Sequence, residues 1–129
     1  MICPCGSTKS FETCCQPLIK GEKQASSPEQ LMRSRYTAFC QKNMQYIEDT
    51  TDPQARMEFD RKGNEEWANS SQFLKLEILQ SSEDGNKGMV EFKATFQTGD
   101  GPEQVHHEIS KFRKHGGTWY FRDGRAKTK

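Results

Sequence analysis

Four cysteines stand near the start of the chain at spacings that suit one metal ion. They form two pairs separated by residues 6–13: Cys3 and Cys5, then Cys14 and Cys15. Thiolates so close in sequence can converge on one tetrahedral ion, and small cysteine-rich sites of this kind favour Zn²⁺. Iron also accepts four thiolates. The spacing therefore predicts a metal site and leaves zinc and iron open.

Two disulfides are the competing interpretation of the same cysteines. They would require an oxidising compartment and usually a secretory leader. Cys3 follows Met1 almost at once, so we expect no such leader and a cytoplasmic, reducing location. The adjacent Cys14 and Cys15 would also make a strained disulfide. A frayed N-terminus with unused cysteines is the remaining alternative.

Little apolar surface accompanies the cysteine pairs. Phe11, Leu18 and Ile19 are too few to form a core of their own. The order of residues 1–22 must then come from the metal, whose binding contributes about 10–16 kcal/mol in zinc-finger peptides. Without metal, we expect this segment to be disordered.

Composition allows one polar globular domain beyond the cysteines. The chain has 129 residues, of which 32% are hydrophobic and 29% charged. No stretch approaches the roughly 20 apolar residues that span a bilayer. The net charge of +1 gives no general electrostatic reason to expect nucleic-acid binding, because such proteins usually carry a strong basic excess.

A helix is expected after a linker at residues 21–27. Ser27 is a suitable N-cap, with Pro28 at the first helical position and Gln30 completing a capping box. The helix should run to about residue 42. Its apolar residues are spaced to form one stripe: Leu31, Met32, Tyr36, Phe39 and Cys40. Cys40 is expected to be a small buried hydrophobe rather than a reactive thiol.

Two further helices should follow. A short one is expected at residues 44–50, ending before Asp52-Pro53 because the residue before proline disfavours helix. Another should cover residues 54–68. Gly63 and Asn64 interrupt its apolar pattern, which predicts a break or kink there.

From residue 73 the apolar period changes to two, which is typical of half-buried antiparallel strands. Turn sequences at residues 84–86, 99–101 and 115–117 separate four strands, of which the third covers about 104–114 and the fourth about 118–122. Helices followed by a four-stranded meander predict an α+β fold, with the helices against one face of the sheet.

Several strings amount to a family resemblance. Residues 3–7, CPCGS, together with Cys14-Cys15 resemble the SEC-C motif, the zinc-binding tail of the preprotein translocase motor SecA. Residues 31–39, LMRSRYTAF, Trp67 and residues 119–124, WYFRDG, are similar to the YchJ family of SEC-C proteins. The resemblance covers nearly the whole chain.

That resemblance implies a metal-binding knuckle at residues 1–22 and a nuclear-transport-factor-2-like (NTF2-like) domain at residues 26–129. The implied domain is a cone, in which a curved antiparallel sheet wraps around about three helices and encloses a pocket. Some SEC-C motifs use histidine as the fourth ligand, a position that Cys15 fills here. Many relatives carry a second motif near the C-terminus, whereas this sequence has no cysteine after Cys40, so functions that need both motifs are not expected of it.

Four thiolates leave no open position on the metal for a catalytic water. We therefore expect a structural ion. In SecA the motif is associated with binding a chaperone, so the resemblance implies a protein-interaction or adaptor role. Lys9, Phe11 and Lys20 are then candidates for the docking surface.

The implied pocket supports a second hypothesis, a small-ligand binder or an enzyme, because this fold hosts isomerases and dehydratases. Strand alternation places His106, Glu108, Ser110 and Phe112 on one face, and His107 on the other. A glutamate there could act as a general base. The candidate pocket residues are Arg33, Arg35, Tyr36, Trp67, His106 and Glu108.

Structural roles for these residues are the alternative. Glu108 and His106 could be solvated or paired across strands, and one of the two arginines could pair with Glu108 in the interior. Tyr36 and Trp67 could simply pack in the core.

RNA or ribosome binding is a third class, based on the knuckle and the basic residues 122–129. The low net charge and the lack of an aromatic stacking row oppose it. The sequence leaves the partner and the oligomeric state open.

Overall fold

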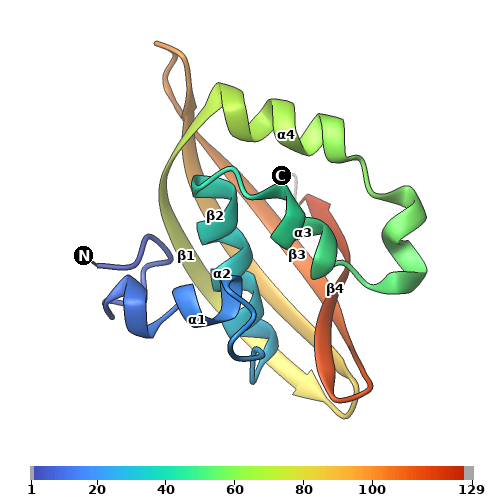
Figure 1. Ribbon diagram of the computed structural model, residues 1–129. Helices are drawn as coiled ribbons and strands as arrows, with labels where there is room; N and C mark the ends of the chain where they lie inside the picture. The colour runs from blue at the N-terminus through green and yellow to red at the C-terminus, as the bar shows by residue number, and fades with distance from the viewer. Residues whose placement is uncertain (1, 127–129) are drawn as a thin grey trace.

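Helices come first in the computed structural model and a four-stranded sheet follows, as Figure 1 shows. The structure describes residues 2–126, so Lys127 and Lys129 of the predicted basic tail lie outside the described residues. No helix in this part of the chain is long and apolar enough to cross a membrane. The elements are η1 (Phe11–Thr13), α1 (Gln16–Ile19), α2 (Pro28–Cys40), α3 (Met44–Asp49), η2 (Pro53–Glu58), α4 (Arg61–Ser70), β1 (Ser71–Asp84), β2 (Lys87–Thr98), β3 (Glu103–His115) and β4 (Thr118–Ala126).

The sheet is an antiparallel meander in the order β1-β2-β3-β4, which confirms the predicted α+β class. Helix α2 packs against β1, β2 and β4, and α3 packs against α2 and α4. Two register shifts in the pairing of β1 with β2 and one in the pairing of β3 with β4 interrupt the regular ladder, and such bulges bend and twist strands locally. The sheet twists around the helices, with α4 along one end (Figure 1).

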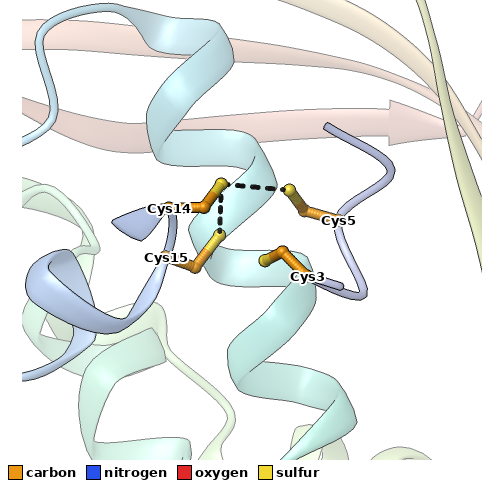
Figure 2. Close-up of side chains that lie close together, drawn as sticks. All are labelled: Cys3, Cys5, Cys14 and Cys15. Carbon is orange, nitrogen blue, oxygen red and sulfur yellow. Dashed lines mark hydrogen bonds between the residues drawn. The ribbon is translucent and has the colours of Figure 1, made fainter. Parts of the chain in front are cut away.

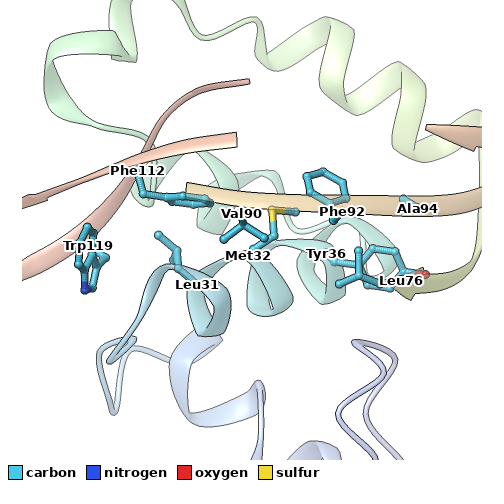
Figure 3. Close-up of a cluster of buried hydrophobic side chains, with 9 residues drawn as sticks. All are labelled: Leu31, Met32, Tyr36, Leu76, Val90, Phe92, Ala94, Phe112 and Trp119. Carbon is cyan, nitrogen blue, oxygen red and sulfur yellow. The ribbon is translucent and has the colours of Figure 1, made fainter. Parts of the chain in front are cut away.

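The main core lies between α2 and the sheet. Figure 3 shows the side chains of α2 pointing at the inner face of the strands. Burial of each large apolar side chain contributes about 1.5–3 kcal/mol. The buried members are Leu31, Met32, Tyr36, Leu76, Val90, Phe92, Ala94, Phe112 and Trp119. All of them except Trp119 are apolar residues whose period of two or helical spacing predicted this arrangement.

Helix α2 begins as expected and ends two residues early. Ser27 Oγ accepts a hydrogen bond from Gln30 N at 3.1 Å. After Cys40, Lys42 has a positive φ of 60°, Lys42 N donates to Phe39 O and Asn43 N donates to Ala38 O. These two bonds are a Schellman ending, a geometry that usually selects glycine. Because a lysine stands at this position, no glycine in the sequence signals the end of the helix.

The predicted break at Gly63-Asn64 is wrong. The chain instead forms the separate 3₁₀ helix η2, and α4 begins after Asp60. Asp60 Oδ1 accepts a hydrogen bond from Gly63 N at 2.9 Å, which makes Asp60 the N-cap. A Cβ on Gly63 would stand 2.2 Å from the Asp60 carboxylate. Gly63 therefore admits the cap at the start of α4 instead of breaking the helix.

Asp52 links the helical part of the chain to the sheet through hydrogen bonds. It is fully buried and accepts two hydrogen bonds from Arg113 of β3, from Nε at 2.5 Å and from Nη2 at 2.7 Å. Its backbone N also donates to Phe121 O. The hydrogen bonds from Arg113 lower the pKa of the Asp52 carboxyl to about 2, against the opposing effect of burial.

We predict that Asp52→Asn lowers the free energy of unfolding by about 2 kcal/mol at pH 7. The folded pKa lies below the unfolded one, so this stabilisation is full above about pH 4 and is lost as the pH falls towards 2. Urea denaturation at pH 7 and at pH 3 measures it, with the exposed Glu65→Gln as the control. Equal unfolding free energies for wild type and Asp52→Asn at pH 7 would contradict the role given to this ion pair.

Candidate functional site

Tight turns bring the two cysteine pairs together. Cys3 N donates to Lys9 O at 2.8 Å, and an antiparallel bridge joins Ile2 to Ser10. Gly6 has a φ of +82°, and a Cβ there would lie 3.1 Å from Leu76 O of β1. Glycine thus permits both the turn and its close approach to the sheet. Cys14 and Cys15 lie between the short helices η1 and α1, next to the first pair.

The four sulfurs of Cys3, Cys5, Cys14 and Cys15 form one compact group, shown in Figure 2. All lie within 4.8 Å of one another. Cys5 and Cys14 Sγ are 3.6 Å apart, and Cys14 and Cys15 Sγ are 3.9 Å apart. A regular tetrahedron of sulfurs about 2.3 Å from Zn²⁺ has edges of about 3.8 Å. The cluster therefore fits a tetrahedral ion.

Charge also favours a cation at this cluster. The contact with Cys15 lowers the pKa of the Cys5 thiol to about 4, and the same contact raises the pKa of Cys15. Burial raises the pKa of Cys14. Adjacent thiolates repel one another in a buried site, so all four can ionise together only beside a positive ion.

Helix α2 supplies polar contacts to the cysteine cluster. Thr37 Oγ1, which is fully buried, donates to Cys15 Sγ at 3.4 Å and lies 3.7 Å from Cys3 Sγ. Arg33 Nη1 donates to Cys5 O at 2.6 Å. These are the outer-sphere groups that hold ligands in place around a metal.

The sequence did not reveal these two roles. Arg33 was a candidate for the pocket, but it does not line the cavity: it lies on the opposite side of α2, where its Nε also bonds Glu29 at 3.0 Å. Arg33 and Thr37 are four residues apart, which places them on one helix face. That spacing was visible, but which face meets the cysteines was not.

A cavity of about 410 Å³ lies on the other side of α2; we call it the cone cavity. The remaining five candidates, Arg35, Tyr36, Trp67, His106 and Glu108, all contribute to its lining. Residues that sequence reasoning missed also line it, among them Ser110 and Phe121. Phe121 lies in the WYFRDG string, two residues after the buried Trp119 and paired with the buried Phe112, so strand alternation was the signal that could have found it.

Glu108 is a half-buried carboxylate of the cone cavity. His106 Nε2 lies 2.8 Å from its Oε1, and Ser110 Oγ donates to its Oε2 at 2.5 Å. Burial raises the pKa of Glu108, but the bonds to His106 and Ser110 and the charge of Arg35 outweigh it and leave the pKa below its ordinary value. Glu108 is therefore ionised at neutral pH. Gly124 on β4 makes room for it, because a Cβ there would lie 2.2 Å from Glu108 Oε2.

Arg35 has a different set of contacts from the one expected. Its Nη1 donates to Ile47 O at 3.0 Å and to Thr50 Oγ1 at 2.7 Å, and its guanidinium lies 4.4 Å from the centre of the Phe121 ring. Burial lowers its pKa to about 10, so it stays charged. Among residues 2–126, Arg35 makes no ion pair with Glu108 and influences it through its charge alone.

Aromatic side chains surround the remaining space. Trp67 stands at their centre, 5.5 Å from Phe39, 5.0 Å from Phe73 and 5.9 Å from His106 between ring centroids. Tyr36 is almost fully buried and belongs to the core as well as to the cavity lining.

Two predicted side chains lie elsewhere. His107 points to the opposite face of the sheet, where its Nε2 is 2.7 Å from Glu91 Oε2. Cys40 is partly buried against the main core, and burial raises its pKa to about 11, so it is a poor nucleophile.

Comparison with protein families gives one matching description: "YchJ, middle NTF2-like domain", over residues 27–124. A UPF0225 protein of Geobacter sulfurreducens is 48% identical over 126 residues, which cover 95% of this chain and 78% of that protein. UPF0225 proteins of Haemophilus influenzae are similar at 42% identity over 122 residues, 94% of this chain and 76% of the relative from strain PittEE.

Solved structures of SEC-C motif proteins are also similar to this chain. A SEC-C motif containing protein from Rhodopseudomonas palustris has a TM-score of 0.93 at 52% identity and covers 99% of this chain and 100% of that one. Another from Psychrobacter arcticus has a TM-score of 0.84 at 33% identity, covering 100% and 84%. A calcium/calmodulin-dependent kinase II association domain from Thiobacillus denitrificans, with a TM-score of 0.65 at 10% identity over 81% of this chain and 96% of that one, shares the fold.

We predict that Thr37→Val weakens metal binding by about tenfold, because it removes the hydroxyl that donates to Cys15 Sγ and keeps the shape of the side chain. Competition with a chromophoric chelator measures the affinity. Thr95→Val, a buried threonine on β2, is the matched control and should bind metal as the wild type does. An unchanged affinity for Thr37→Val would remove Thr37 from the site.

Proposed function

The chain belongs to the YchJ family of SEC-C motif proteins, and on that premise we propose that it is a cytoplasmic protein-interaction module shaped by a structural metal ion. The observation that carries the proposal is the group of four cysteine sulfurs within 4.8 Å of one another. Zn²⁺ is the proposed ion, and iron is the alternative that elemental analysis distinguishes.

The donor set supports a structural and not a catalytic ion. Cys3, Cys5, Cys14 and Cys15 would fill all four positions of a tetrahedral site, so a bound Zn²⁺ would supply folding energy and would have no place for a reacting water. Cys3, Cys5 and Cys15 are buried, and only Cys14 is partly exposed. Thr37 and Arg33 tie the two cysteine pairs to α2.

The surface around Cys14 supports docking. A hollow of about 400 Å³ lies beside it, and its lining includes Ser7, Lys9, Glu29 and Arg33. Lys9 and Lys20 are exposed on the same N-terminal segment. The metal would hold this mixed-charge surface in one conformation, which reduces the entropy lost when a partner binds.

We predict that a protein partner captured by the wild-type chain is lost in the double variant Lys9→Glu/Lys20→Glu, because charge reversal opposes docking and leaves the thiols intact. Pull-downs from nuclease-treated extract measure this. The matched control is Lys62→Glu/Lys87→Glu, which reverses two exposed charges on α4 and β2. Retention of every partner by both Lys9→Glu/Lys20→Glu and Cys14→Ser would refute the proposal, and partners lost on nuclease treatment would favour RNA.

The cone cavity supports a second candidate function, binding of a small ligand. The observation that favours it is the ionised, half-buried Glu108, bonded to His106 and Ser110, inside an aromatic cavity of about 410 Å³. Ligand pockets of roughly 300–1,000 Å³ typically combine apolar walls with a few placed polar groups. Nε2 of His106 contacts Glu108, and within residues 2–126 its Nδ1 has no hydrogen-bond partner.

We predict that the neutral fluorescent probe N-phenyl-1-naphthylamine binds in the cone cavity with micromolar affinity, because its rings match the aromatic walls. Probe fluorescence measures binding, and Trp67→Ala should weaken it by about tenfold. The control Trp119→Phe alters the other tryptophan, which lies in the main core away from the cavity lining. Equal probe binding by wild type and Trp67→Ala would exclude this cavity as the binding site.

A further inference from the structure

We propose that the cone cavity binds a ring-bearing organic cation, a substituted ammonium whose charge lies among the aromatic rings near Glu108. This inference rests on the second candidate function, that the cavity takes a small ligand, and adds the chemical class of that ligand. Two independent features carry it: the aromatic wall and the balance of charges in the lining.

The aromatic wall suits a cation. Trp67 meets Phe73, Phe39 and Phe96 in edge-to-face arrangements at 5.0 to 5.6 Å between centroids, which fixes the ring orientations. Trp67 and Phe73 are only partly buried and line the cavity. The faces of such rings are electron-rich, and tryptophan attracts cations best. Aromatic side chains grouped around a site are the usual means by which proteins recognise quaternary ammonium groups.

The charges that line the cavity are mostly negative. Four carboxylates face two guanidinium groups in the lining, and His106 lies beside one of the carboxylates: Glu58, Asp60, Glu108 and Asp123 against Arg35 and Arg122. Glu108 is the half-buried member of the four carboxylates, and its lowered pKa keeps it ionised. An anionic ligand would meet this excess of negative charge, whereas a cation is attracted by it.

Arg35 does not reverse this preference. Its Nη1 already bonds Ile47 O and Thr50 Oγ1, and its guanidinium packs over the Phe121 ring at 4.4 Å. The guanidinium is thus held on the α3 side of the cavity, where its Nη1 is occupied by a backbone carbonyl and a hydroxyl. Glu108 keeps acceptor capacity, because each carboxylate oxygen has more than one lone pair and each accepts one bond here.

A matched series of probes tests the class of ligand. Benzyltrimethylammonium is the cation, neopentylbenzene is its neutral isostere with carbon in place of nitrogen, and phenylacetate is an anion of similar size. Displacement of N-phenyl-1-naphthylamine gives each affinity, and Trp67 fluorescence in Trp119→Phe reports binding directly, because the chain has two tryptophans. We expect the cation to bind about tenfold more tightly than the isostere, and phenylacetate more weakly than both.

Two variants locate the charge that selects the cation. Glu108→Gln should lower the affinity for the cation by about fivefold and change the affinity for the neutral isostere by no more than about twofold. Glu58→Gln, at an exposed position on the rim, should also lower the affinity for the cation, without a risk to folding. Glu66→Gln, on α4 outside the lining, is the matched control and should change neither affinity.

The cation proposal and the proposal that the cavity binds a ligand can fail separately. If the isostere or phenylacetate binds as tightly as the cation, or if Glu108→Gln and Glu58→Gln leave the cation unaffected, the cation proposal is wrong and the cavity remains a site for another ligand. If neither the naphthylamine nor any member of the series responds to Trp67→Ala, the cavity is no ligand site and both proposals fall.

Discussion

One helix, α2, lies between the cysteine cluster and the cone cavity and contacts both. On one side Thr37 donates to Cys15 Sγ and Arg33 donates to Cys5 O, so the cysteine cluster is tied to the helix by side chains as well as by packing. On the other side Arg35 and Tyr36 face the cone cavity. A displacement of α2 would therefore disturb the cysteine cluster and the cavity together. The candidate metal site and the candidate ligand site share one rigid element, although among residues 2–126 no cysteine of the cluster lines the cavity.

Much of this arrangement is encoded locally and was predictable. The spacing of the four cysteines, the Ser27 cap of α2 and the strict alternation around Val90 and Phe92 each depend on short-range geometry. The alternation also placed His106 and Glu108 on the inner face and His107 on the outer one, as the structure has them. The division into residues 1–22 and 26–129 stays a prediction, as does the assignment of the four cysteines as metal ligands.

The remainder depends on contacts between distant segments, and local patterns do not contain them. Gly63 suggested a break, but it serves the Asp60 cap, and Lys42 adopts a conformation usually left to glycine. Arg33 was a candidate for the cavity because the sequence predicts the helix but not which of its faces points to the cavity. The fourth strand was predicted to end at about residue 122, so Gly124 was given no role, and only the folded sheet shows that it makes room for Glu108. Each of these errors concerns a residue whose role is set by a partner far away in the sequence or by a cap.

The most direct test of the central claim is to compare amide NMR spectra and metal content before and after treatment with a strong chelator. The account predicts one Zn²⁺ or iron ion per purified chain. On its removal, the signals of residues 2–22 should collapse to disordered positions, those of Arg33 and Thr37 should shift, and those of β2 and β3 should stay. A metal-free chain with sharp, dispersed signals for residues 2–22, or a spectrum unchanged by the chelator, would contradict the claim that a metal orders this segment against α2.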